Sequence, residues 1–465
     1  MSLKKNALAT VALTGMAVAV SSAYAAGFQL TEQSSLGLGR AYAGAGIVGD
    51  DLSAAHYNAA GMTLLPGTQI QAGSVFVEVD APFKGVNGES ENGRLKGQAL
   101  PAGYITHQVN DKLWLGLSMT VPYGLGTEYA DNWVGAEKGN QSMLMTIDIN
   151  PNIAYKLTDK LSIGAGVSLQ YAKAELGQGQ IVNGVNVKDG VVNGDSWAAG
   201  FNLGLMWEPT DTLRFGLAYR SQIAHDASGK MKATVDNAAY KAQEAKTAAE
   251  NAVAAAQAAA AQGDMNTAAL RQQEAENYAS QAVTYQSMIG RAGSTVMTMD
   301  DFNVRVTTPD TIMATATWEA TQDLRLSGLV RWARWSNLDE LHITSSLIPG
   351  GLQVNEYQWQ DTWLFSVGAD YRIDGNWTVR GGVAYETSAV EKAELRTATI
   401  PDADRVWFSL GGSYNYSKQL QIDFGATYLM GVGNMDIYNH AGTQKIGEFD
   451  SLDAYIIGAQ VQYRF

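Results

Sequence analysis

Residues 451–465 read SLDAYIIGAQVQYRF, and their side chains fall into two alternating sets. The first set is Tyr455, Ile457, Ala459, Val461, Tyr463 and Phe465, and the second is Ala454, Ile456, Gly458, Gln460, Gln462 and Arg464. Successive side chains of a β-strand point to opposite faces, so this stretch predicts a strand with one apolar face and one mainly polar face. Strands of membrane barrels have this pattern, with the apolar side toward lipid and the polar side toward the lumen.

The same alternation recurs upstream, separated by connections that are alternately short and long. Fourteen segments are predicted as strands: residues 68–79, 97–109, 112–121, 142–156, 160–173, 196–208, 212–222, 302–318, 323–337, 356–373, 376–388, 404–417, 419–432 and 451–465. Short periplasmic turns and long outer loops are typical of outer-membrane barrels. The sequence therefore predicts an all-β fold, a 14-stranded antiparallel transmembrane β-barrel over residues 67–465. A soluble β-sandwich also alternates, but it would rarely expose large apolar side chains on so many faces.

Composition excludes several other classes of protein. The 465 residues include 32 Lys and Arg against 46 Asp and Glu, a net charge of −14, which argues against a nucleic-acid binder. The mean hydropathy of −0.13 argues against a bundle of membrane helices. There is no cysteine, and the five histidines are scattered without ligand spacing, so no metal site and no cofactor are expected.

Residues 1–25 predict a secretory signal peptide. Lys4 and Lys5 precede an apolar run over residues 7–20, and Ala23 and Ala25 supply the small residues that signal peptidase requires. The run is shorter than the roughly 20 residues of a membrane-spanning helix, which argues against an anchor. Export combined with membrane strands predicts a location in the outer membrane of a Gram-negative bacterium.

Residues 26–66 lack the alternation of the later segments. They are too few to build a core of their own, and too apolar and alanine-rich for a simple solvated tail. We expect them to pack inside the barrel as an N-terminal hatch. A flexible periplasmic leader is the alternative.

Short motifs along the mature chain resemble the FadL family of outer-membrane transporters for long-chain fatty acids and other hydrophobic compounds. They are Ala26–Leu30, Gly37–Tyr42, Pro122–Thr127, Asp148–Pro151, Trp332–Ser336, Asp361–Trp363 and Ile400–Trp407. The resemblance covers nearly the whole mature chain except about 232–291. It implies a 14-stranded barrel plugged by an N-terminal hatch, in agreement with the strand count.

The resemblance also nominates site residues. The family's hatch carries an Asn-Pro-Ala motif where this chain has Asn58-Ala59-Ala60, so the rigidity that proline provides is absent. In the family the hatch N-terminus reaches the ligand pocket, which nominates Phe28. The family releases its ligand sideways beside a kinked third strand. Pro122, Gly124 and Gly126 match that position, since proline removes a ladder donor and glycine allows a kink.

Placing the apolar faces outward leaves charged side chains directed into the lumen. They are Arg214, Arg220, Arg325, Arg331, Arg380, Arg464, Asp148, Asp370 and Asp423. A fatty acid carries a carboxylate, and an arginine beside apolar side chains suits it as a head-group anchor. Arg331 is the first candidate, because Leu329 and Trp335 share its face. The alternative is that these charges pair with one another in a wet lumen.

Residues 232–291 do not fit a barrel. Twenty of these 60 residues are alanine, and a heptad-like seam runs along the first half: Val235, Ala238, Ala242, Ala245, Ala249, Ala252, Ala256 and Ala259. A break at 262–264 precedes a second stripe: Ala268, Ala275, Ala279, Ala282 and Ile289. We predict an α-helical hairpin in the extracellular loop between strands 7 and 8. Its role remains open: the hairpin could extend a capture site for the ligand, shield the pore, bind a partner, or have no role in transport.

Together these features predict a passive outer-membrane channel for hydrophobic compounds, with long-chain fatty acids as the first candidates, and not an enzyme. Transport would proceed by hatch rearrangement and lateral exit near strand 3. The expected partners are hydrophobic small molecules and the surrounding lipid and lipopolysaccharide, without nucleic acid, and the expected state is a monomer. Two other interpretations are an adhesin or receptor barrel that displays the hairpin, and an outer-membrane lipid hydrolase.

Overall fold

The computed structural model of the chain describes residues 27–92, 97–130, 133–134, 140–178, 181–182, 185–290, 293–344, 352–439 and 442–465. The expected signal peptide, residues 1–25, lies outside these residues. Within the described part, no helix has the length and apolar character needed to cross a membrane.

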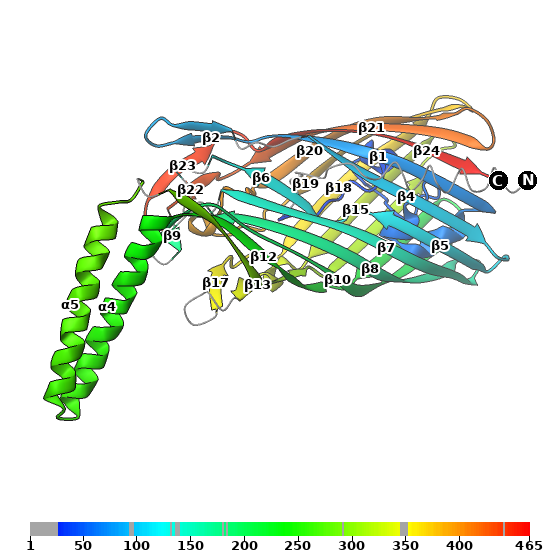
Figure 1. The fold of residues 1–465 in the computed structure, drawn as a ribbon. Helices are drawn as coiled ribbons and strands as arrows, with labels where there is room; N and C mark the ends of the chain where they lie inside the picture. The colour runs from blue at the N-terminus through cyan, green and yellow to red at the C-terminus, as the bar shows by residue number, and fades with distance from the viewer. Residues whose placement is uncertain are drawn as a thin grey trace, which may run out of the picture.

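Fourteen antiparallel strands close into a barrel, which confirms the predicted fold (Figure 1). Closure follows because β1 pairs with both β24 and β4. The strands are β1 Thr68–Asp80, β4 Gln98–Gln108, β5 Leu113–Thr120 continued by β6 Gly124–Glu128, β7 Gln141–Thr158, β8 Leu161–Gln178, β10 Val185–Thr210, β11 Leu213–Arg220 continued by β12 Ile223–Asp236, β13 Ser294–Thr308 continued by β14 Thr311–Glu319, β15 Leu324–Ala333 continued by β16 Glu340–Thr344, β17 Leu352–Glu356 continued by β18 Thr362–Arg372, β19 Trp377–Glu386, β20 Asp404–Asn415, β21 Leu420–Val432 and β24 Asp453–Arg464.

The faces of the strands follow the alternation of the sequence. In β24, Tyr455 and Ile457 are exposed, whereas Gln460 and Gln462 are buried in the barrel. Exposed aromatic side chains gather near the short turns: Tyr155, Trp207, Phe215, Trp318, Tyr371, Trp377, Tyr463 and Phe465. A second group lies toward the long loops: Trp197, Trp363, Tyr385 and Tyr455. Two aromatic girdles around an apolar band are typical of barrels that span the outer membrane.

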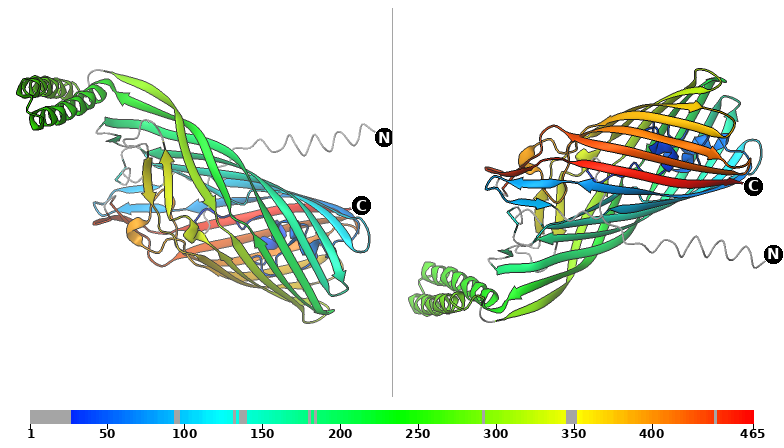
Figure 2. Two further views of the ribbon diagram at one scale, coloured as in Figure 1. Left: turned by 90° about the horizontal axis from the view of Figure 1, so that it is seen from below. Right: turned by 90° about the horizontal axis from the view of Figure 1, so that it is seen from above.

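Four strands run beyond the ends that alternation predicts. β8 and β10 continue through much of residues 174–195, and β12 and β13 cover residues 223–236 and 294–301, where the sequence predicted no strand. Together with β9 Ile181–Val182 they form a ribbon that projects from the loop end (Figures 1 and 2). The prediction was wrong there because a strand outside the membrane has no lipid-facing apolar side, so the alternation on which the prediction rested disappears.

The alanine-rich insertion forms two antiparallel helices, α4 Asn237–Ala261 and α5 Met265–Gln286, joined at Gly263. The α4 seam is buried as predicted at Ala238, Ala242, Ala245, Ala252 and Ala256. On α5, Ala275 is buried, whereas Ala279 and Ile289 are exposed. Residues 232–236 continue β12 instead of starting the helix. The hairpin projects to one side of the barrel, at a steep angle to its axis, at the end far from the C-terminus (Figure 1).

Removing residues 237–286 should leave both the thermal unfolding midpoint and the uptake rate of the barrel unchanged. The buried alanines of the hairpin pack mainly within the hairpin itself, so their loss removes few contacts from the barrel. Circular dichroism melting of the purified protein and uptake of a labelled fatty acid would measure the two quantities. Loss of uptake by a barrel that still melts at the wild-type temperature would instead assign the hairpin a role in transport.

Residues 27–66 fill the inside of the barrel and are almost all buried. They contain three short helices, α2 Ser35–Leu38, α3 Ala54–Tyr57 and η1 Ala59–Leu64. This segment, the hatch, lies directly against glycines of the wall. A Cβ atom added at Gly382 would lie 2.4 Å from the carbonyl group of Arg40, and one at Gly425 would lie 2.3 Å from the carbonyl oxygen of Ser35. Glycine is therefore needed there so that the hatch backbone can touch the wall.

The loop end carries a small second sheet and two short helices. The sheet consists of β2 Pro82–Gly85, β3 Ser90–Asn92, β22 Asp436–Tyr438 and β23 Lys445–Phe449, and the helices are η3 Trp335–Asn337 and η4 Ala393–Leu395. The loop before β20 reaches across to strand 3. Thr127 Oγ1 donates to the carbonyl oxygen of Thr399 at 2.6 Å, and the Tyr129 hydroxyl donates to that of Ala398 at 3.1 Å.

Candidate functional site

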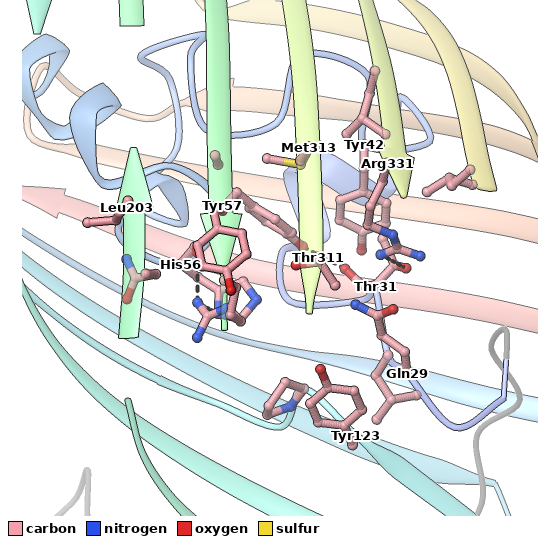
Figure 3. Close-up of a pocket in the computed structure, with 18 residues that line it drawn as sticks. Gln29, Thr31, Tyr42, His56, Tyr57, Tyr123, Leu203, Thr311, Met313 and Arg331 are labelled. Carbon is pink, nitrogen blue, oxygen red and sulfur yellow. Dashed lines mark hydrogen bonds between the residues drawn. The ribbon is translucent and has the colours of Figure 1, made fainter. Parts of the chain in front are cut away.

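A cavity of about 50 Å³ lies between the first residues of the hatch and the wall. Residues from the hatch, strand 3 and strands 6 to 10 line it, and Figure 3 shows how they converge. Its apolar side includes Leu30, Ala218, Met313, Leu329 and Leu364. Its polar side includes Gln29, Thr31, His56, Asn202, Arg220 and Arg331. This volume accommodates a few water molecules and is far too small for a long acyl chain.

Three aromatic side chains surround Phe28. The ring centroid of Phe28 lies 4.6 Å from that of Trp335, 5.8 Å from that of Trp359 and 6.2 Å from that of Tyr123. Gly27 has a φ of +65°, and a Cβ atom there would lie 2.6 Å from the Trp359 ring. The structure thus brings Phe28 and Trp335, two predicted pocket residues, into contact. Trp359 was not predicted as a pocket residue: the sequence placed it in a strand over residues 356–373, whereas it lies in the loop before β18, which begins at Thr362.

Strand 3 is broken at the position matched by Pro122 and Gly124. β5 ends at Thr120 and β6 begins at Gly124, and both parts pair with β7. On the other side, β4 pairs with strand 3 only up to Gly103 opposite Met119. In the part of the chain that the structure describes, no pairing joins β4 to β6, which contains Gly126. Among the described residues, the wall therefore has no ladder hydrogen bonds between β4 and β6, on the loop side of Gly103.

The first hatch residues, 27–33, occupy the inner side of this break, and we call them the N-terminal segment. Leu30 N donates to the carbonyl oxygen of Pro122 at 2.8 Å, and Gly124 N donates to that of Phe28 at 3.0 Å. Gln33 adds two bonds to the backbone of Val121, at 2.8 and 3.1 Å. The same short segment thus forms one side of the cavity and pairs with the broken strand.

Asn58 joins the hatch to the wall of strands 6 and 7. Its side-chain nitrogen donates to the carbonyl oxygen of Leu205 at 3.0 Å, and its side-chain oxygen accepts from Ala60 N at 3.1 Å, which caps η1. Ala59 and Ala60 are fully buried, and a Cβ atom at Gly164 would lie 2.4 Å from Ala60 N. The turn after Asn58 forms without the proline of the family motif, because the cap and the close wall contact hold it.

Both arginines of the cavity already have carboxylate partners. Arg331 donates to Glu386 Oε1 and to Thr31 Oγ1, each at 2.8 Å. Arg220 donates to Asp148 Oδ2 at 3.0 Å and to the carbonyl oxygen of His56 at 2.9 Å. The alternative that lumenal charges pair with one another therefore describes Arg220 and Arg331 in this structure. Any carboxylate ligand of Arg331 would have to compete with Glu386.

An ion-pair network closes the hatch toward the short turns. Arg40 of the hatch lies 3.0 Å from Asp50 and 3.4 Å from Asp370, and Arg380 lies 2.9 Å from the same Asp370. Arg325 joins the network through Asp50 at 3.1 Å. Burial would by itself raise the pKa of Asp50, but Arg40 and Arg325 hold this pKa below its usual range. The charged network stabilises the hatch against this part of the wall.

A closed transmembrane barrel with aromatic girdles, an internal hatch and a lumenal cavity defines a plugged outer-membrane channel. The family model described as outer membrane protein transport protein (OMPP1/FadL/TodX) matches residues 16–465. The chain belongs to this family, whose members are channels that transport hydrophobic compounds across the outer membrane.

Relatives and solved structures agree with this assignment. The long-chain fatty acid transport protein of Escherichia coli strain K12 is 28% identical over 514 aligned positions, which cover both chains completely. Outer membrane protein P1 of Haemophilus influenzae strain Rd is 27% identical over 90% of this chain and 89% of its own. The crystal structure of a Pseudomonas aeruginosa FadL homologue superposes with a TM-score of 0.72 at 21% identity, over 95% of this chain and 100% of that one. The Pseudomonas putida toluene transporter TodX superposes with a TM-score of 0.65 at 16% identity, with the same coverage.

Proposed function

We propose that this protein takes up long-chain fatty acids passively, by displacement of the N-terminal segment and lateral exit beside strand 3. One observation carries the proposal: the N-terminal segment both encloses the cavity and pairs with the broken strand at Pro122 and Gly124. Displacing it would enlarge the cavity and free the edge of the break at the same time. The names of the Escherichia coli and Pseudomonas putida relatives refer to a fatty acid and to toluene, and both are hydrophobic solutes.

The size of the cavity supports a rearrangement of the hatch. A volume of about 50 Å³ excludes an acyl chain, so binding requires residues to move. The best candidate is Phe28, whose ring occupies a site formed by Trp335, Trp359 and Tyr123. An apolar ligand that replaced the Phe28 ring would bury similar surface in the same place. The ligand would then supply the free energy that releases the segment.

The ion pairs between the hatch and the wall near the short turns argue for a sideways exit. Arg40, Asp50 and Asp370 are paired and largely buried there, so a path straight toward the periplasm would have to separate buried ion pairs. Leaving between β4 and β6, on the loop side of Gly103, would break no ladder hydrogen bond among the residues that the structure describes. By this route a hydrophobic solute would also pass directly into the apolar part of the membrane. We further expect the closed barrel to act as a monomer surrounded by lipid and lipopolysaccharide.

We expect the double substitution Arg331→Met/Glu386→Gln to lower the uptake of an ionised fatty acid and to leave that of a neutral hydrocarbon of similar length unchanged. Removing both partners avoids a buried unpaired Glu386, which would destabilise the protein by itself. Uptake of the two labelled solutes into proteoliposomes measures the difference. Equal loss for both solutes would show that Arg331 has only a structural role.

The substrate class can be tested directly. The purified protein should retain a bound fatty acid that mass spectrometry of an organic extract identifies, and deletion of its gene should abolish growth on long-chain fatty acids. Growth at the wild-type rate, or retention of only aromatic hydrocarbons, would contradict the fatty-acid assignment.

A further inference from the structure

Glu32 is a buried acid that the transport route above does not use. It lies in the N-terminal segment, directly after Thr31, and only 1% of its surface is exposed. Its Oε2 atom has no hydrogen-bond partner among the residues that the structure describes. A buried carboxylate with an unpaired oxygen is expensive because it loses much of the solvation of its charge. The position therefore disfavours the ionised form of Glu32.

Titratable groups from several elements face Glu32, and the two arginines among them offset only part of the effect of burial on its pKa. They are Arg331 of β15, Glu386 of β19, Arg405 of β20, and Tyr42 and Tyr57 of the hatch. Arg331 is engaged with Glu386 and Thr31, and Arg405 donates to Asp402 at 2.6 Å. Among the described residues, no arginine forms a salt bridge with Glu32.

The charge of Glu386 adds to the cost of ionising Glu32. The second oxygen of Glu386, Oε2, is buried and also lacks a partner in the described part of the chain. A proton on Glu32 would remove one of the two negative charges that interact here, those of Glu32 and Glu386. Without that proton, two buried negative charges would repel each other across the contact between the N-terminal segment and the wall.

We propose that Glu32 is a proton-operated latch, which holds the N-terminal segment against the wall while neutral and releases it on ionising beside Glu386. The latch deepens the proposed rearrangement of the hatch and rests on it. Burial, assisted by Glu386, raises the pKa of Glu32 from 4.5 to about 7. The titration of the latch therefore lies near neutral pH.

The sign of the pH effect follows from proton binding. Between pH 4.5, where a released Glu32 ionises, and about pH 7, the seated segment binds a proton that the released segment does not. Raising the pH through this window therefore favours release. Each pKa unit corresponds to a factor of ten, so the ratio of seated to released segment falls by up to roughly two orders of magnitude.

A spin label on Gln29→Cys would report the release, since the chain contains no other cysteine. The paramagnetic resonance spectrum of the labelled protein in detergent should gain a mobile component as the pH rises through the window. The same label in Glu32→Gln should stay immobile throughout, because glutamine mimics the neutral acid. In Glu386→Gln the midpoint should move to lower pH. Glu356→Gln, an exposed acid before β18, serves as the control and should behave like wild type.

A wild-type spectrum without pH dependence would overturn the latch, and so would an unchanged transition in Glu32→Gln. If Glu32→Gln does not fold, an unchanged midpoint in Glu386→Gln would overturn it equally. No substrate is present in this measurement. Failure of the transport proposal would therefore appear in the uptake assays and leave the spectra unaffected.

Discussion

Oxidation of the variant Gln29→Cys/Tyr123→Cys is expected to lower uptake at least tenfold, and reduction is expected to restore it. Residues 29 and 123 face each other in an antiparallel bridge flanked by two backbone hydrogen bonds. In this arrangement the side chains are at their closest, with Cα atoms about 4.5 Å apart, a distance that a disulfide can span. The bond would hold the N-terminal segment on strand 3 and keep both the cavity and the break closed.

Comparing the oxidised and reduced forms of one variant removes the effect of losing the Tyr123 ring. A second disulfide, Thr63→Cys/Ser162→Cys, serves as the matched control, since these hydroxyl oxygens lie 3.0 Å apart and join the last turn of the hatch to β8. This bond should leave uptake unchanged if only the N-terminal segment moves. Loss of uptake with both disulfides would mean that the hatch moves as a whole. Undiminished uptake with the first disulfide would refute displacement of the segment.

Gly382→Ala is expected to destabilise the protein by about 1–3 kcal/mol, a typical effect of overpacking, and to open a leak for small hydrophilic solutes. The added methyl group would lie 2.4 Å from the backbone of Arg40, so the hatch or β19 must shift. Arg40 carries ion pairs to Asp50 and Asp370, and a shift of its backbone would strain both. Thermal unfolding and single-channel conductance measure the two effects.

The neighbouring glycine provides the control. A methyl group at Gly381 meets its nearest atom, in Leu410, at 3.5 Å, which is an ordinary contact. Gly381→Ala changes the same strand by the same group, and should keep the stability and the conductance of the wild type. Equal stability of the two variants would show that the hatch tolerates displacement and does not depend on close contact with the wall.

Much of the fold was predictable because strand alternation is a local property. The face of each residue in β24 follows from its position in residues 451–465, and the buried seam of α4 follows from the spacing of its alanines. The fourteen strands and the α-helical hairpin were therefore predicted correctly. The outer parts of β8, β10, β12 and β13 were missed because they lie outside the membrane, where the outward side chains of β12, for example, are polar (Asp226, Ser228 and Lys230) and no apolar periodicity marks the strand.

The candidate site was only partly predictable. Phe28 and Trp335 were nominated and do meet, and Arg331 does line the cavity. Glu386 was missed, although it lies six residues after Arg380 on β19 and so has its side chain on the same, lumenal face. Alternation along a strand gives only the face of a residue, whereas its partner depends on register across several strands. Arg331 and Glu386 lie on either side of β18, each opposite Leu364.

The amino-acid sequence by itself determined the class of fold, the plugging segment and the location in the outer membrane. These depend on composition and on periodicities of a few residues, which act within one segment at a time. Only the tertiary structure decided that the N-terminal segment pairs with the broken third strand, that glycines of the wall touch the hatch, and that each cavity arginine meets a carboxylate. These contacts join residues far apart in the chain, and they form only when the barrel closes and its register brings the strands into place.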